Sequence, residues 1–164
     1  LNHLAEINYI FGNSIANVST ISIFLVCLCF LVPFICDTFA YLIGKAIGGQ
    51  KLCPKISPKK TISGAIGGIL ITILLLSVLY VILASIPSMN DVLVSFGFTW
   101  WKVALFALVA SVMCELGDLF ESHLKRKANM KDSSNLLPGH GGMLDRVDGL
   151  AFVVPVVIIF AFII

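Results

Sequence analysis

The sequence predicts an all-α fold, a polytopic membrane helical bundle with about four transmembrane helices. Apolar residues (AVILMFWYC) make up 59% of the 164 residues and charged residues only 12%, whereas soluble domains carry about 25% charged residues. Four segments reach the length of about 20 apolar residues that a helix needs to cross the hydrocarbon core. Too few polar residues remain to coat a soluble surface, so the composition excludes a soluble enzyme, a disordered chain and a nucleic-acid binder.

Each span has recognisable ends. Glycines and prolines break the lysine-rich stretch after the first span into a loop. The second span opens on Gly64 and Gly68, whose GxxxG spacing predicts close helix packing. Trp100 and Trp101 are typical of an interfacial anchor at the start of the third span. A Pro-Gly-His-Gly-Gly turn precedes the fourth span. We expect the four spans at about 18–43, 62–86, 99–120 and 147–164.

The amino-terminal residues 1–17 contain one charge, Glu6, and are expected to form a loop or the stub of a preceding span. The membrane-embedded domain is expected to cover residues 18–164. The chain starts at Leu1 without a recognisable signal peptide, so we expect it to begin partway through a longer protein. The five cysteines lack metal-ligand spacing, and the four that lie in apolar runs are expected to act as small hydrophobic residues.

Two basic loops, 44–61 and 121–146, contain ten of the eleven basic residues. Because two spans separate them, both loops must emerge on the same side of the membrane. Short basic loops stay in the cytoplasm, which predicts that both face it. The 88–98 loop has a single charge, Asp91, and is expected on the opposite side.

Acidic residues interrupt the spans near the ends that meet the basic loops. A charged side chain at the centre of a membrane helix costs about 2.5–3.5 kcal/mol on insertion scales, so it usually has a partner and a function. Clustered carboxylates need a counter-charge, and oxygen ligands suit magnesium. Topology alone places five acids in one layer: Asp37, Glu115, Asp118, Asp145 and Asp148.

Taken singly, each acid has an ordinary structural explanation. Asp145 can cap the fourth span, and Asp148 can interact with the helix dipole. Asp37 can pair with Lys45 at the interface, and Glu115 can bridge to a nearby lysine. A functional site is favoured by the joint pattern, because five acids lie at one depth beside Gly-rich or Lys-rich turns.

The basic loops supply groups that suit anions. Lys59 and Lys60 lie immediately before the second span, where free N–H groups also attract negative charge. The alternative is that these lysines only set orientation and contact anionic lipid heads. The His-Gly-Gly segment at 140–142 offers an approachable backbone near Arg146, which suits phosphate. Acids, a divalent cation and basic loops at one interface suit phosphoryl or nucleotidyl transfer to a lipid head group.

The run SHLKRKANMKDSSNLLPGHGGMLDRVD at 122–148 resembles the signature of the phosphatidate cytidylyltransferases, the CDP-diacylglycerol synthases. Its many specified positions make a chance match negligible. DTFAYLIGK at 37–45, PKISPKKT at 54–61 and GDLFES at 117–122 resemble the same family. The resemblance covers about 35–164, the carboxy-terminal part of a usually longer fold. Phe39 departs from the small residue of many members, and Glu115 lies in a variable stretch.

The resemblance implies a nucleotidyltransferase of phospholipid biosynthesis, whose catalytic domain is 18–164. CTP and phosphatidic acid would give CDP-diacylglycerol and pyrophosphate, with magnesium as cofactor and a second cation left open. Asp118 and Asp145 would carry the metal, and Asp148 and Asp37 would complete the catalytic residues. The expected substrate-binding residues are Ser57, Lys59, Lys60, Lys125, Arg126, Lys131, His140, Gly141, Gly142 and Arg146.

The expected partners are CTP, phosphatidic acid and membrane lipids, without nucleic acid, and a homo-oligomer is left open. The active site of this multi-pass protein is expected to face the cytoplasm, from the inner membrane if the protein is bacterial. One alternative is a CTP-dependent polyprenol or phytol kinase, which would transfer the γ-phosphoryl group. Another is an ion or proton transporter, which would favour acids at mid-bilayer and two repeats; the sequence has no visible internal repeat.

Overall fold

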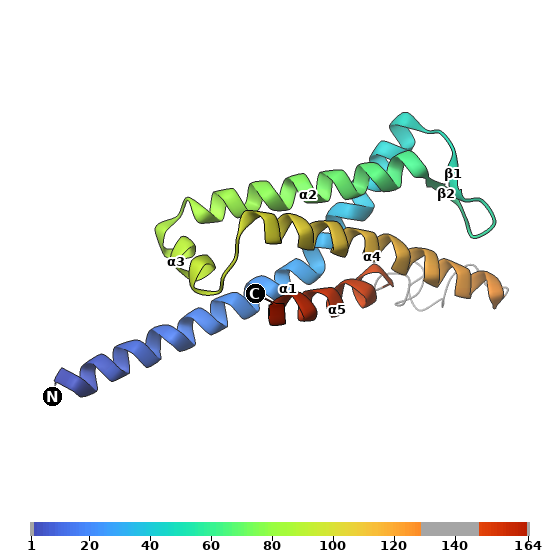
Figure 1. Cartoon of the computed structure of the whole chain (residues 1–164). Helices are drawn as coiled ribbons and strands as arrows, with labels where there is room; N and C mark the ends of the chain where they lie inside the picture. Colours follow the sequence, from blue (N-terminus) through green and yellow to red (C-terminus); the bar gives the residue numbers. More distant parts are fainter. Residues whose placement is uncertain (1, 129–147, 164) are drawn as a thin grey trace, which may run out of the picture.

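The computed structural model describes residues 2–128 and 148–163, with side chains described at 20, 22–128 and 148–162. Helices dominate these residues, so the all-α prediction is confirmed (Figure 1). A two-stranded antiparallel hairpin is the non-helical element of the described part. In chain order the elements are α1 (Asn2–Ile47), β1 (Lys51–Cys53), β2 (Ser57–Thr61), α2 (Ile62–Ala84), α3 (Pro87–Ser95), α4 (Trp100–Lys127) and α5 (Asp148–Ile163).

Three helical segments of the described chain are long and apolar enough to cross a membrane: Ser22–Ile47 within α1, all of α2, and all of α4. The fourth expected span corresponds to α5, whose apolar part, Asp148–Phe162, is shorter. Large apolar side chains remain exposed on the outer faces, and Phe162 is 87% exposed. Apolar surface of this extent indicates contact with lipid. Where about four spans were expected, the described residues thus form three helices of sufficient length and one shorter apolar helix.

Helix α1 differs from the expectation at its amino-terminal end. It runs without interruption from Asn2 to Ile47, through Pro33, where a loop or stub over 1–17 and a span from about 18 were expected. Figure 1 shows this end extending beyond the other helices. Hydropathy locates the part of a helix that suits lipid, but helical hydrogen bonding continues through polar residues. The apolar boundary and the helix boundary are therefore different positions.

Both segments expected as basic loops contain regular structure. In the first, β1 pairs with β2, with Lys51 opposite Thr61 and Cys53 opposite Ser57. Gly48 and Gly49 precede the hairpin with φ of 68° and 103°, which favour glycine. In the second, α4 continues to Lys127 instead of ending near residue 120. The 88–98 loop likewise contains most of α3, which begins at Pro87.

Aromatic side chains fill the end of the bundle remote from the hairpin. The ring of Phe98 lies 5.8 Å from those of Phe24 and Phe160, in edge-to-face geometry. Phe160 stacks on Phe106 at 4.6 Å. Phe98 lies just before α4 in the chain, and its ring contacts connect α1 with α5. The stacking of Phe160 on Phe106 connects α5 with α4. Packing between aromatic rings therefore holds this end together.

Glycines let the helices approach closely at the other end. A Cβ on Gly64 would lie 2.5 Å from the carbonyl oxygen of Ala40, and one on Gly68 would lie 2.8 Å from that of Cys36. The packing predicted from the GxxxG spacing is thus confirmed, between α2 and α1. A Cβ on Gly117 would lie 2.8 Å from the carbonyl oxygen of Asp148. Gly117 therefore brings the start of α5 against α4.

Candidate active site

Three carboxylates meet where α5 begins beside α4. Asp118 and Glu121 lie three residues apart on α4, and Asp148 is the first residue of α5. One oxygen from each lies within 4.8 Å of the others. Glu121 is buried, whereas Asp118 and Asp148 are partly exposed. A set of carboxylate oxygens this close fits a hard divalent cation.

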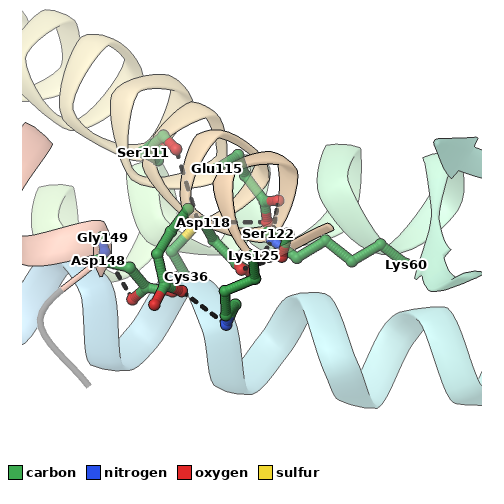
Figure 2. A network of polar contacts seen from close by, with 10 residues as sticks. Cys36, Lys60, Ser111, Glu115, Asp118, Ser122, Lys125, Asp148 and Gly149 are labelled. Carbon is green, nitrogen blue, oxygen red and sulfur yellow. Dashed lines mark hydrogen bonds and ion pairs between the residues drawn. The ribbon is translucent and has the colours of Figure 1, made fainter. Parts of the chain in front are cut away.

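Lys60 lies between two carboxylates of α4. Its Nζ is 2.5 Å from Asp118 Oδ2 and 2.7 Å from Glu115 Oε2. Figure 2 shows the lysine reaching these acids from one side, with Asp148 on the other. Burial alone would lower the pKa of Lys60, but the Asp118 and Glu115 carboxylates outweigh it and raise that pKa above its usual range. The ammonium therefore stays charged at neutral pH.

Local hydrogen bonds orient the acids. Ser122 Oγ donates to Asp118 Oδ1 at 3.3 Å, and Lys125 Nζ lies 2.8 Å from Glu121 Oε2, one helical turn away. The Gly149 N–H donates to Asp148 Oδ1 at 2.7 Å. That contact agrees with the alternative of Asp148 as a first-turn charge. The same residue also contributes an oxygen to the carboxylate cluster.

The placement of Lys60 follows from how α2 begins. Thr61 is the N-cap of α2, and its Oγ1 accepts the Gly64 N–H at 3.1 Å, which satisfies one of the free donors at the helix start. Lys60 immediately precedes this cap in β2. Arg126, near the end of α4, donates from Nε to the Ile56 carbonyl at 3.3 Å. The hairpin is thereby held against the end of α4.

A pocket of about 660 Å³ opens beside this ion-pair network. That volume is in the range of small-molecule sites, about 300–1,000 Å³. Lysines line one part of it and acids another, so it offers groups for anions and for a cation together. The charged lining residues are Asp37, Lys45, Lys51, Lys59, Lys60, Glu115 and Asp118.

The structure brings several expected site residues together. Asp37, Lys59, Lys60 and Asp118 line the pocket, and Asp148 lies beside Asp118. Ser57 begins β2, and Lys125 and Arg126 lie in the last turn of α4. The remaining expected residues lie outside the described ranges: Lys131, His140, Gly141, Gly142, Asp145 and Arg146.

The alternatives for single acids have different outcomes. Within the described residues no ion pair joins Asp37 to Lys45, whose Nζ lies 5.9 Å from the Tyr41 ring centroid instead. The alternative for Glu115, a bridge to a lysine, is confirmed by its contact with Lys60. Asp145 as a helix cap lies outside the described ranges.

Glu121 was not among the expected site residues. Its spacing from Asp118 was a usable signal, because residues three apart share a helix face. Hydropathy alone ends the third span near residue 120 and so assigns Glu121 to a loop. Helix α4 continues to Lys127. One stripe of this helix therefore carries Glu115, Asp118 and Glu121.

Comparison with known proteins places these residues in a family context. The profile of a family described as the cytidylyltransferase family matches residues 4–164. Relatives named phosphatidate cytidylyltransferase include one from Staphylococcus saprophyticus, 39% identical over 126 residues, and one from Bacillus subtilis, 44% identical over 119. These matches cover 77% and 73% of this chain but 44% and 40% of the relatives. The chain thus spans less than half their length.

Proposed function

Because the chain belongs to the cytidylyltransferase family, we propose that it transfers the cytidylyl group of CTP to phosphatidic acid, forming CDP-diacylglycerol and pyrophosphate. The relatives named phosphatidate cytidylyltransferase support this choice of substrates. The observation that carries it is the three-carboxylate cluster of Asp118, Glu121 and Asp148 beside a lysine-lined pocket. This arrangement supplies opposite charges for a cation and for phosphates within one site.

The reaction needs little proton transfer from the protein. A phosphate oxygen of phosphatidic acid attacks the α-phosphorus of CTP, and the bond to pyrophosphate breaks with its electron pair. The second pKa of a phosphate monoester is about 6, so the attacking oxygen is already ionised at neutral pH. Positioning and charge neutralisation therefore supply most of the rate.

The residues of this chain divide these tasks. When bound, a divalent cation supplies charge neutralisation at the phosphates, and we assign magnesium to this role because the donors are carboxylate oxygens. Asp118 and Asp145 remain the expected ligands, with Glu121 and Asp148 as further candidates. Asp37 supports the site from the pocket wall.

The basic residues bind the substrates' phosphates. Lys59 and Lys60 contact them from the hairpin, and Lys125 and Arg126 from the end of α4. Ser57, Lys131, His140, Gly141, Gly142 and Arg146 complete the proposed binding set. An apolar membrane-facing surface lets the acyl chains stay in the bilayer while the head group reacts.

The reacting end of the bundle faces the cytoplasm in this proposal. Lys45, Lys51 and Lys55 of the hairpin side and Lys127 of α4 gather there, and the positive-inside rule keeps such segments cytoplasmic. Cytosolic CTP then reaches the pocket without crossing the membrane.

Pyrophosphate release tests the function. The chain is reconstituted in liposomes and supplied with CTP, with and without phosphatidic acid and magnesium, and the Bacillus subtilis relative serves as positive control. We expect pyrophosphate and CDP-diacylglycerol only when all components are present, and none after EDTA. Failure of the chain where the relative succeeds would overturn the proposal. CDP as the nucleotide product would instead support the lipid kinase.

A further inference from the structure

Glu115 is a buried carboxylate of the candidate site that does not belong to the cluster of Asp118, Glu121 and Asp148. Its side chain is 7% exposed, yet it lies on the stripe of α4 that also holds Asp118. Oε2 is 2.7 Å from Lys60 Nζ, and Oε1 accepts from Cys36 Sγ at 3.9 Å. The carboxylate therefore has partners on β2 and α1. Because these contacts fix the Glu115 carboxylate, it can hold the Lys60 ammonium in one position.

Lys60 contacts two carboxylates that differ in their surroundings. Asp118 belongs to the cluster that fits a divalent cation, whereas Glu115 lies outside that cluster. Lys60 Nζ is 2.5 Å from Asp118 Oδ2, and Ser122 occupies Oδ1. A cation at Asp118 must therefore compete with an ammonium that already contacts the same carboxylate. Like charges this close repel unless another acid compensates.

We propose that Glu115 is a positioning residue that retains the Lys60 ammonium while Asp118 binds the cation. The inference rests on the proposed function, because that function places a cation at the cluster. With Glu115 in place, the lysine keeps one carboxylate partner when Asp118 turns to the cation. It then stays within the pocket, where it serves the phosphates of the substrate. Without Glu115, the lysine has Asp118 as its sole acidic contact among those described, and it opposes the cation.

Binding of Mn²⁺ alone, measured by electron paramagnetic resonance on the detergent-solubilised chain without nucleotide, tests this role. In Glu115→Gln we expect the Mn²⁺ dissociation constant to rise about tenfold or more, as for other residues that orient metal ligands. Asp91→Asn is the matched control, because it removes one exposed carboxylate of α3, outside the pocket. We expect that control to bind Mn²⁺ like the unmodified chain. An unchanged dissociation constant in Glu115→Gln would overturn the proposal.

A double-mutant cycle separates positioning from simple attraction of the cation by a negative charge. If Glu115 acts through the lysine, Lys60→Met removes the competition, and adding Glu115→Gln to it changes Mn²⁺ affinity by less than about twofold. If Glu115 attracts the cation directly, the loss of affinity in Glu115→Gln persists in the Lys60→Met background. That persistence would overturn the proposal.

Glu115→Asp guards against a variant that fails to fold. It keeps the charge but shortens the side chain by one methylene, which breaks the 2.7 Å contact with Lys60. If Glu115 acts by positioning Lys60, this variant should bind Mn²⁺ more weakly; if only its charge matters, Mn²⁺ binding should be unchanged. The thermal transition of each variant without metal reports whether it folds. If the unmodified chain binds Mn²⁺ but releases no pyrophosphate, the proposed function fails while the affinities still decide the role of Glu115. If it binds no Mn²⁺, this inference fails as well.

Discussion

The two ends of the helical bundle are held together by different forces. At one end Phe24, Phe98 and Phe160 interlock through apolar faces. At the other, Lys60 and the acids of α4 form directional contacts, and Gly64 and Gly117 bring the helices close. The same helices thus contribute aromatic packing at one end and the charged groups of the candidate site at the other. Substitutions at the two ends should therefore have separable effects.

The largest effect is expected from Asp118→Asn at the charged end. The amide keeps the shape but loses the charge that the cation requires, so pyrophosphate release should fall by about 10²–10³-fold, while insertion and the thermal transition in detergent change little. The matched control is Asp91→Asn, which should keep full activity. Near-normal turnover in Asp118→Asn would show that this acid does not serve the cation.

Phe98→Ala tests the aromatic end. Phe98 is 2% exposed and contacts two other rings, so its loss should cost about 3–5 kcal/mol of unfolding free energy. We expect a lower midpoint of thermal unfolding in detergent, with Mn²⁺ affinity unchanged below that temperature. Exposed Phe162 provides the control, since Phe162→Ala should leave the midpoint nearly unchanged. Weaker Mn²⁺ binding in folded Phe98→Ala would contradict the separation of the two ends.

The close approach of α2 to α1 can be tested with two glycines that lie three residues apart in α2. A Cβ on Gly64 would lie 2.5 Å from the backbone oxygen of Ala40, whereas one on Gly67 would meet side-chain atoms of Ile43, whose methyl groups can shift although its Cβ stays 3.1 Å away. Gly64→Ala should therefore cost about 1–3 kcal/mol through overpacking, and Gly67→Ala less. Thermal unfolding of both variants measures the difference. A cost for Gly64→Ala no greater than that for Gly67→Ala would show that the Ala40 backbone shifts readily to make room for the added Cβ.

The smallest effect is expected from Lys59→Ala. This lysine is exposed and lines the pocket, and exposed charge pairs contribute only about 0.2–1 kcal/mol. The CTP concentration for half-maximal pyrophosphate release should rise by about fivefold or less, with unfolding unchanged. Lys55→Ala, on the hairpin but outside the pocket lining, is the matched control. An unchanged CTP requirement in Lys59→Ala would return Lys59 to a role in membrane orientation alone.

Much of the fold followed from patterns in the sequence. The apolar run at 62–86 nearly coincides with α2, because a buried or lipid-facing helix has to be apolar over its length. The GxxxG spacing predicted close helix packing at Gly64 and Gly68, and the structure shows that the partner is α1. Charge placement put the hairpin and the last turn of α4 at the same end, as the Arg126 contact with Ile56 shows.

The rest depended on information that hydropathy does not contain. A two-stranded hairpin is marginal alone, so β1 and β2 depend on packing against helices and on Arg126. The continuation of α4 to Lys127 rests on backbone hydrogen bonds, which polar residues also make. Asp118 and Asp148 were predicted in one layer, but Glu121 was missed because the predicted span ended too early. The ion pairs of Lys60 with Glu115 and Asp118 depend on how β2 packs against α4, which the spacing of residues along the sequence does not predict.

The Thr61 cap links the position of Lys60 to the position of helix α2. Lys60 adjoins the residue that starts α2, so the ammonium moves with that helix. A slip of one residue would rotate the helix start by about 100° and shift it by about 1.5 Å, enough to swing the amine off both acids. Gly64 and Gly68, seated against the α1 backbone, resist such sliding. The contacts of Lys60 with Asp118 and Glu115 therefore depend on the register of α2 against α1.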